Sequence, residues 1–147
     1  MKTLPFAFML TAYCSVSFAL FAIISNTLMG GLVYLFLLLP IYGLSVLAGW
    51  IFVWQYWGKT VQIKRRYWSV VLALQTLTCL TSPGNCFGVK QGDRCYSNLQ
   101  ILVGQASRSG MNTAPHWPLV EDAFYGLAIA YSIALIVSLV KTLTVKE

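Results

Sequence analysis

Three cysteines carry the most reactive side chains of the polar part of this sequence. Cys86 and Cys95 are separated by eight residues, and Cys79 lies shortly before them. In an oxidising compartment such a pair forms a disulfide, and closing so short a loop stabilises the fold by about 2–3 kcal/mol. We expect a structural Cys86–Cys95 disulfide, with Cys79 as the alternative partner of either cysteine. Catalytic redox pairs use a Cys-x-x-Cys spacing at a helix N-terminus, which this segment lacks.

A second group of reactive side chains surrounds the sequence Trp117-Pro118. His116 is the only histidine, and Glu121 and Asp122 are two of the four acidic residues. Proline suits the first turn of a helix, and carboxylates there interact favourably with the helix dipole. We therefore expect a structural role, with a polar surface site for a proton or cation as the functional alternative. No span contains a histidine that could ligate haem, and the cysteines are too scattered for zinc, so we expect no cofactor and no metal.

The composition places these residues in a membrane protein. Of the 147 residues, 58% are hydrophobic and 10% are charged, and the mean hydropathy is +0.70. Soluble domains carry about 25% charged residues. The length allows one small helical bundle without a separate catalytic domain. The net charge of +6 is not gathered on a soluble basic domain, which argues against nucleic acid as a partner.

Four apolar runs predict an all-α fold, with four transmembrane helices in a single bundle over residues 1–147. The turn-forming sequence Ser25-Asn26-Thr27 separates the first two runs, and Pro40 should kink the second helix. The third run is short, and crossing the bilayer requires its flanking basic residues to snorkel. The predicted helices lie near 5–24, 28–57, 65–82 and 119–141, and a 38-residue extracytoplasmic loop spans 81–118.

Basic residues predict that both termini lie in the cytoplasm. Seven lysines and arginines fall on the side of the termini and three on the other side, in the longer loop. The first helix continues well past Ala19, so we expect it to be retained rather than cleaved as a signal peptide. Anchors at the cytoplasmic interface combine aromatic and basic side chains, namely Trp54, Trp57, Lys64, Arg65, Arg66 and Trp68.

The predicted spans contain no charged residue near their centres. Pumps, ion-coupled transporters and voltage sensors keep ionisable groups there, so these functions are disfavoured. Gln75, Thr76 and Thr78 are the most polar central residues, and we expect them to hydrogen-bond neighbouring helices.

Two local features are predicted within the outer loop. Gly88 and Gly92-Asp93 should fold the chain back between the two cysteines. Residues 96–106 have apolar side chains at helical spacing, and Ser97 or its neighbour is a candidate cap. This predicts a short amphipathic helix on the outer membrane surface, or alternatively a face that docks a partner protein.

The topology resembles that of small four-helix quinone-linked thiol oxidases, which have inside termini and cysteines in the last outer loop. That resemblance would imply a redox relay from the outer cysteines to a membrane quinone. The family also needs a reactive pair in the first outer loop, which here is Ser25-Asn26-Thr27.

The sequence favours a non-enzymatic integral membrane protein that acts as an accessory or interaction subunit of a membrane complex. Its expected partners are the lipid bilayer and other membrane subunits, or a second copy of itself. The alternatives are the quinone-linked thiol–disulfide redox protein and a small immunity protein against a membrane-acting toxin. We expect it in the bacterial inner membrane, with the thylakoid or another energy-transducing membrane as the alternative.

Overall fold

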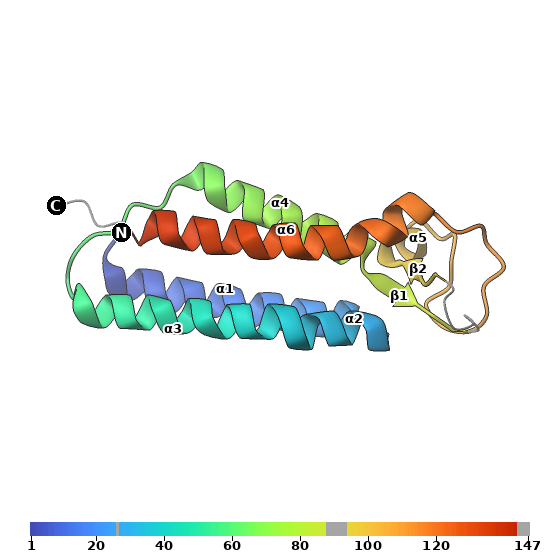
Figure 1. The fold of residues 1–147 in the computed structure, drawn as a ribbon, viewed down its shortest axis with the longest axis horizontal. Helices are drawn as coiled ribbons and strands as arrows, with labels where there is room; N and C mark the ends of the chain where they lie inside the picture. The colour runs from blue at the N-terminus through green and yellow to red at the C-terminus, as the bar shows by residue number, and fades with distance from the viewer. Residues whose placement is uncertain (26, 88–93, 144–147) are drawn as a thin grey trace.

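Four helical rods lie side by side and account for most of the molecule (Figure 1), a computed structural model that describes residues 1–25, 27–87 and 94–143. The first rod is α1 (Thr3–Ile24), and the second comprises α2 (Leu28–Val33), the π-helical η1 (Tyr34–Leu38) and α3 (Leu39–Gln55). The other two rods are α4 (Arg65–Thr81) and α6 (Pro118–Thr142). Helix α1 begins and α6 ends at the same end of the molecule.

Three of these rods are long and apolar enough to cross a membrane. They are Thr3–Ile24, Leu28–Gln55 and Pro118–Thr142, and the mean hydropathy of an 18-residue window in each is 2.1, 2.1 and 2.2, respectively. The apolar runs of the sequence therefore correctly predicted three membrane-length helices. Helix α4 forms where the remaining span was predicted, but it has 17 residues and begins with two arginines.

Pro40 changes the backbone hydrogen bonding of the second rod in the turn that precedes it. Proline has no backbone N–H, and its ring clashes with the carbonyl four residues earlier. Just ahead of it, η1 forms a wide π-helical turn in which the Leu39 N–H donates to the Tyr34 carbonyl, five residues back. A π-helical turn thus replaces the regular α-helix just ahead of the proline and accommodates it.

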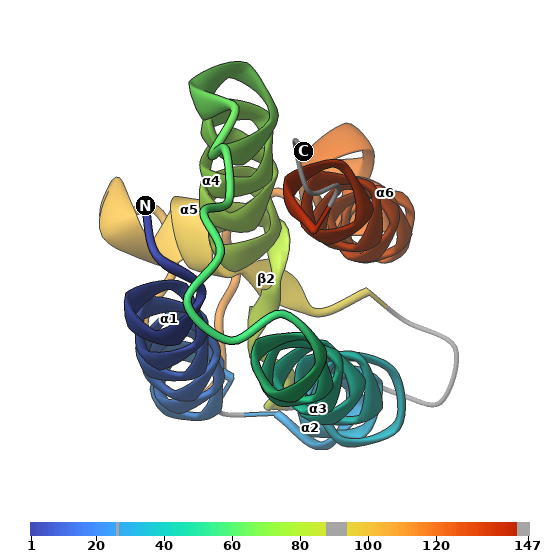
Figure 2. The same cartoon turned by 90° about the vertical axis from the view of Figure 1, so that its left-hand side faces the viewer.

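The rods pack in two pairs, α1 with α3 and α4 with α6 (Figure 2). Gly49 permits the close approach of the first pair, because a Cβ atom at this position would lie 2.8 Å from Leu10 Cδ2. The buried aromatic side chains of Phe21, Tyr34 and Phe124 meet between the pairs, with ring centroids 4.8 Å apart for the first two and 6.0 Å apart for the last two.

A chain of five polar side chains crosses the interior and joins all four rods. The Tyr13 hydroxyl donates to Gln75 Oε1 at 2.8 Å, and Gln75 Nε2 donates to Ser17 Oγ at 2.9 Å. Tyr131 lies 3.0 Å from Tyr13 and 2.8 Å from Tyr42 through their hydroxyl oxygens. Each hydroxyl can donate one hydrogen bond, and the Tyr13 hydroxyl donates its hydrogen bond to Gln75. The donors therefore run in one direction, from Tyr42 through Tyr131 and Tyr13 to Gln75 and Ser17.

Of the three central polar residues of α4, only Gln75 makes the predicted contact with another helix. Thr76 and Thr78 donate instead to the carbonyl groups of Leu72 and Leu74, one turn back in α4 itself. The expectation for the two threonines was wrong because a short hydroxyl side chain reaches its own helix backbone first.

The described residues of 82–117, between α4 and α6, are called the outer segment and cover the end of the molecule opposite the start of α1 (Figure 1). Strand β1 (Pro83–Asn85) pairs antiparallel with β2 (Tyr96–Ser97), and α5 (Asn98–Leu102) follows at once. The helix predicted over 96–106 is therefore shorter, because its first residues form a strand and Gly104 takes a φ of +75°. Ser97 is the N-cap as predicted. The predicted turn at Gly88 and Gly92-Asp93 lies outside the described residues.

Candidate functional site

The disulfide closes the base of the outer segment. Cys86 directly follows β1 and Cys95 directly precedes β2, and the two form a disulfide with Cα atoms 4.5 Å apart. This confirms the predicted pairing. Cys79 is a buried free thiol near the C-terminal end of α4, so its proposed role as alternative partner was wrong. The antiparallel strands determine this outcome, because they bring together the residues that flank them.

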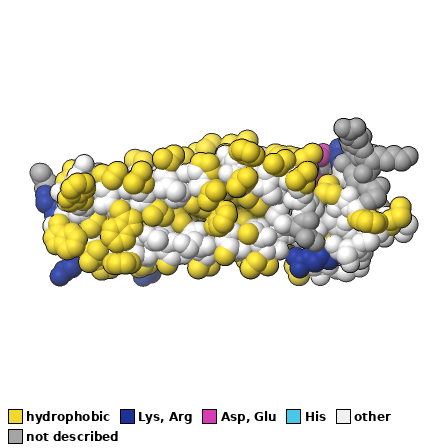
Figure 3. Space-filling view, turned by 90° about the horizontal axis from the view of Figure 1, so that it is seen from below, with side chains coloured by type: hydrophobic (Ala, Val, Ile, Leu, Met, Phe, Trp, Pro, Cys, Tyr) yellow, Lys and Arg dark blue, Asp and Glu magenta, His cyan; other side chains and the backbone are white. Residues whose placement is uncertain are grey.

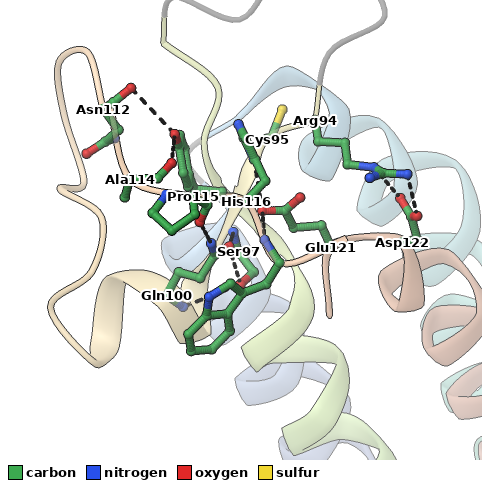
Figure 4. Close-up of polar contacts among 12 residues, drawn as sticks. Arg94, Cys95, Ser97, Gln100, Asn112, Ala114, Pro115, His116, Glu121 and Asp122 are labelled. Atoms are coloured by element: carbon green, nitrogen blue, oxygen red, sulfur yellow. Dashed lines mark hydrogen bonds and ion pairs between the residues drawn. The ribbon is translucent and has the colours of Figure 1, made fainter. Parts of the chain in front are cut away.

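Helix α6 begins at the candidate site, where Glu121 accepts a hydrogen bond from the backbone of the N-cap residue (Figure 4). Glu121 Oε1 accepts the Trp117 N–H at 3.1 Å and lies 3.0 Å from His116 Nδ1. Trp117 is the N-cap residue and has no side-chain cap of its own, and Pro118 follows in the first turn. Glu121 thus acts as the carboxylate does in a capping box. The structure therefore brings His116 and Glu121 together.

His116 is held from its other side by Tyr96. Their rings stack with centroids 4.1 Å apart and planes 17° apart. The buried Tyr96 hydroxyl donates to the Ala114 carbonyl at 2.7 Å, which fixes the chain just before His116. The His116 side chain is 36% exposed, whereas that of Glu121 is 3% exposed. The pair therefore has one face toward solvent and a buried carboxylate beneath it.

Asp122 belongs to a separate ion pair on the same helical turn. Its oxygens Oδ2 and Oδ1 lie 2.9 Å from Nη2 and 3.1 Å from Nε of Arg94. The two side chains are 47% and 60% exposed, and exposed pairs contribute only about 0–1 kcal/mol. Because Arg94 precedes Cys95, this pair connects the disulfide to α6. Asp122 therefore pairs with Arg94 and does not contribute to the His116–Glu121 pair, although the three residues were predicted to form one polar site.

A cavity of about 200 Å³ is bordered by the Arg94–Asp122 ion pair and by Glu121. Its lining includes Met29, Arg94, Cys95, Glu121, Asp122 and Tyr125. Glu121 Oε2 is buried and has no hydrogen-bond partner among the described residues. Leaving a buried acceptor unpaired is costly. The residues that line the cavity thus include Glu121, whose Oε2 is an unpaired acceptor, and Cys95 of the disulfide.

Three amides that the sequence analysis did not single out hold the outer segment together. Asn85 Nδ2 donates to the Ser107 and Gly110 carbonyls at 2.8 and 3.1 Å, and Asn98 Nδ2 donates to Ser82 Oγ at 2.6 Å. Gln100 completes a capping box with Ser97 and also donates to the Pro115 carbonyl at 3.3 Å. The spacing Ser97-x-x-Gln100 is a signal for such a box. The asparagines have no comparable signal, because most of their partners are distant in sequence.

Several apolar side chains of this hydrogen-bonded segment are exposed on its surface. We call Phe87, Leu102, Val103 and Met111 the outer apolar residues; they are 62%, 73%, 53% and 77% exposed. Apolar side chains are visible at this end of the molecule as well as along the rods (Figure 3). Exposed apolar side chains are typical of interaction surfaces where they form a contiguous patch.

The predicted interface anchors lie at the opposite end. Trp54 and Trp57 are 86% and 70% exposed, and the three basic side chains of Lys64, Arg65 and Arg66 are exposed as well. Trp68 differs, since it is half-buried and its Nε1 donates to Thr142 Oγ1 at 3.2 Å. It therefore packs partly between helices, in addition to any contact with the interface.

In the described part of the chain, no three His, Cys, Asp or Glu side chains meet in a group that could hold a metal ion. Comparisons of this chain with known protein families, with curated proteins and with solved structures find no match.

Proposed function

We propose that this chain is a non-enzymatic integral membrane protein that acts as an accessory or interaction subunit of a membrane complex. In this proposal α4 is a fourth span beside α6, and the four rods form a transmembrane bundle. The ends of the chain lie in the cytoplasm, where Lys2, Lys59, Lys64, Arg65, Arg66 and Lys141 gather. The outer segment then lies on the extracytoplasmic side and meets the partner there.

The observation that supports this proposal is the contrast between the interior and the surface of the outer segment. Its buried polar groups are extensively hydrogen-bonded, through Asn85, Ser97, Asn98 and Gln100, and a disulfide closes it. The outer apolar residues nevertheless stay exposed. A rigid surface binds with a smaller loss of conformational entropy than a flexible one. A pre-formed apolar surface of this kind suits a protein partner.

Site-specific photocrosslinking in native membranes tests the proposal. A photoreactive residue in place of Leu102 should give one discrete adduct with a membrane subunit. Gln105 is an exposed polar residue shortly after it and provides the matched control. The proposal predicts a strong adduct at Leu102 and a weak one at Gln105. Equal, diffuse labelling at both positions would contradict it.

A thiol–disulfide redox function is the second candidate, supported by the cavity that borders both Cys95 and Glu121. A dithiol substrate would reduce the Cys86–Cys95 disulfide by exchange, and a quinone would reoxidise the two thiols by accepting two electrons and two protons. Purified protein with a dithiol and a soluble quinone then shows turnover that the Cys86→Ser/Cys95→Ser variant lacks. The subunit proposal predicts no turnover by either protein.

A further inference from the structure

An apolar groove runs between α1 and α4 in the half of the molecule that contains the N-terminus. Its volume is about 230 Å³, and it is lined by Phe6, Met9 and Tyr13 of α1, by Ile63, and by Trp68 and Leu72 of α4. Helix α1 packs mainly on α3, and α4 packs mainly on α6. The groove therefore follows the seam between the two helix pairs.

The polar atoms of the groove residues are already used within the protein. The Tyr13 hydroxyl is bonded to Gln75 and Tyr131, and the Trp68 Nε1–H is bonded to Thr142. The Tyr13 and Trp68 rings meet edge to face, with centroids 5.7 Å apart. The surface left for an occupant consists of aliphatic groups and ring faces. An apolar space of this kind does not hold ordered water and suits a hydrocarbon chain.

Cations lie where the groove approaches the end of the bundle. Lys64, Arg65 and Arg66 are exposed at the start of α4. Arg65 is three residues before Trp68 and seven before Leu72, so it lies on the helix face that lines the groove. The two acidic residues within the described ranges, Glu121 and Asp122, lie at the other end, on the first turns of α6. The surroundings of the groove mouth are thus basic.

We infer that this groove is a binding site for an anionic phospholipid, with one acyl chain between α1 and α4 and the phosphate beside Lys64, Arg65 and Arg66. Juxtamembrane basic residues attract anionic headgroups. A neutral isoprenoid quinone would fill the apolar part without using these cations, which is why the charge pattern favours a phospholipid. The inference rests on the membrane placement given under Proposed function.

Quenching of Trp68 fluorescence by brominated lipid measures occupancy directly. The full-length protein is reconstituted in phosphatidylcholine vesicles that contain either brominated phosphatidylglycerol or the same fraction of brominated phosphatidylcholine. The Trp68 signal is the difference between the wild-type protein and a Trp68→Phe variant. The site predicts at least twofold stronger quenching of Trp68 by the anionic lipid.

Two sets of variants identify the source of this preference. Lys64→Gln/Arg65→Gln/Arg66→Gln should abolish it, whereas Lys59→Gln, whose ammonium lies 5.5 Å above the Tyr56 ring, should preserve it. Leu72→Phe narrows the groove and should reduce quenching, whereas the half-exposed Val70→Phe on another face of α4 should not.

Equal quenching by the two lipids, or a preference that the triple variant retains, would overturn the inference. Quenching by an added brominated quinone that phosphatidylglycerol does not displace would also overturn it and indicate a quinone site. The crosslinking at Leu102 reports on the outer segment alone, so the two proposals can fail separately.

Discussion

The hydroxyl oxygen of Tyr131 lies 3.0 Å from that of Tyr13, and this contact connects α6 to α1 in the interior of the bundle. Tyr131 is also bonded to Tyr42, so its hydroxyl accepts one hydrogen bond and donates the other. Through these bonds the two helix pairs share one directional chain. This hydrogen-bond chain fixes the axial register of the helices, because sliding one helix by a turn along its axis would break the bonds.

Replacing Tyr131 with Phe tests this role. The change removes both hydrogen bonds and should lower the free energy of unfolding by about 1 kcal/mol, because interhelical side-chain bonds in membranes are worth roughly 0.6 kcal/mol each. Tyr125→Phe, at a 52% exposed position of the same helix, should leave stability unchanged. Reversible denaturation in mixed micelles measures both variants. Equal stability of the two would show that the chain does not couple the helix pairs.

Removing the disulfide should lower the free energy of unfolding more than the Tyr131→Phe replacement does. Cys86→Ser/Cys95→Ser restores freedom to the unfolded chain and is expected to cost about 2–3 kcal/mol. Cys14→Ser is the control, because Cys14 is a free thiol in the described structure. Thermal unfolding with and without a reductant gives the measurement. Reductant should lower the Tm of the wild-type protein and leave that of the double variant unchanged.

Glu121 and Asp122 are adjacent but should respond differently to replacement. Glu121→Ala removes the carboxylate that accepts the Trp117 N–H, and loss of such a cap costs about 1 kcal/mol. Asp122→Ala loses an exposed ion pair and should cost less. Raising the salt concentration should erase the effect of Asp122→Ala, because exposed pairs are screened, and should largely preserve that of Glu121→Ala. A larger loss for Asp122→Ala than for Glu121→Ala would contradict this assignment.

The features that could be predicted from the sequence are those set by residues close together in the chain. The apolar runs predicted the membrane-length helices, and the short separation of Cys86 and Cys95 favoured their pairing. Pro118 and the carboxylates that follow it also predicted where the last helix begins. These features depend on residues that are close together in the chain.

The features that were missed join residues that are distant in sequence. Tyr13 and Tyr131 are 118 positions apart, and nothing near either residue indicates the other. Asn85 bonds to carbonyl groups 22 and 25 residues later. Residues 96–106 show helical spacing, but the pairing of Tyr96 with Asn85 in a strand overrides it. In each case tertiary contacts decide between alternatives that the local sequence allows.

The most direct test of the central claim compares the native size of the complex for two proteins expressed at equal levels. Wild-type protein and a Leu102→Ser/Val103→Ser variant are extracted gently from their native membrane and separated by native electrophoresis, with subunits quantified by mass spectrometry. The interaction-subunit account predicts that the wild-type protein migrates in a stoichiometric complex with a partner subunit, from which the variant is released as free protein. Migration of both proteins as the same free species would contradict the account.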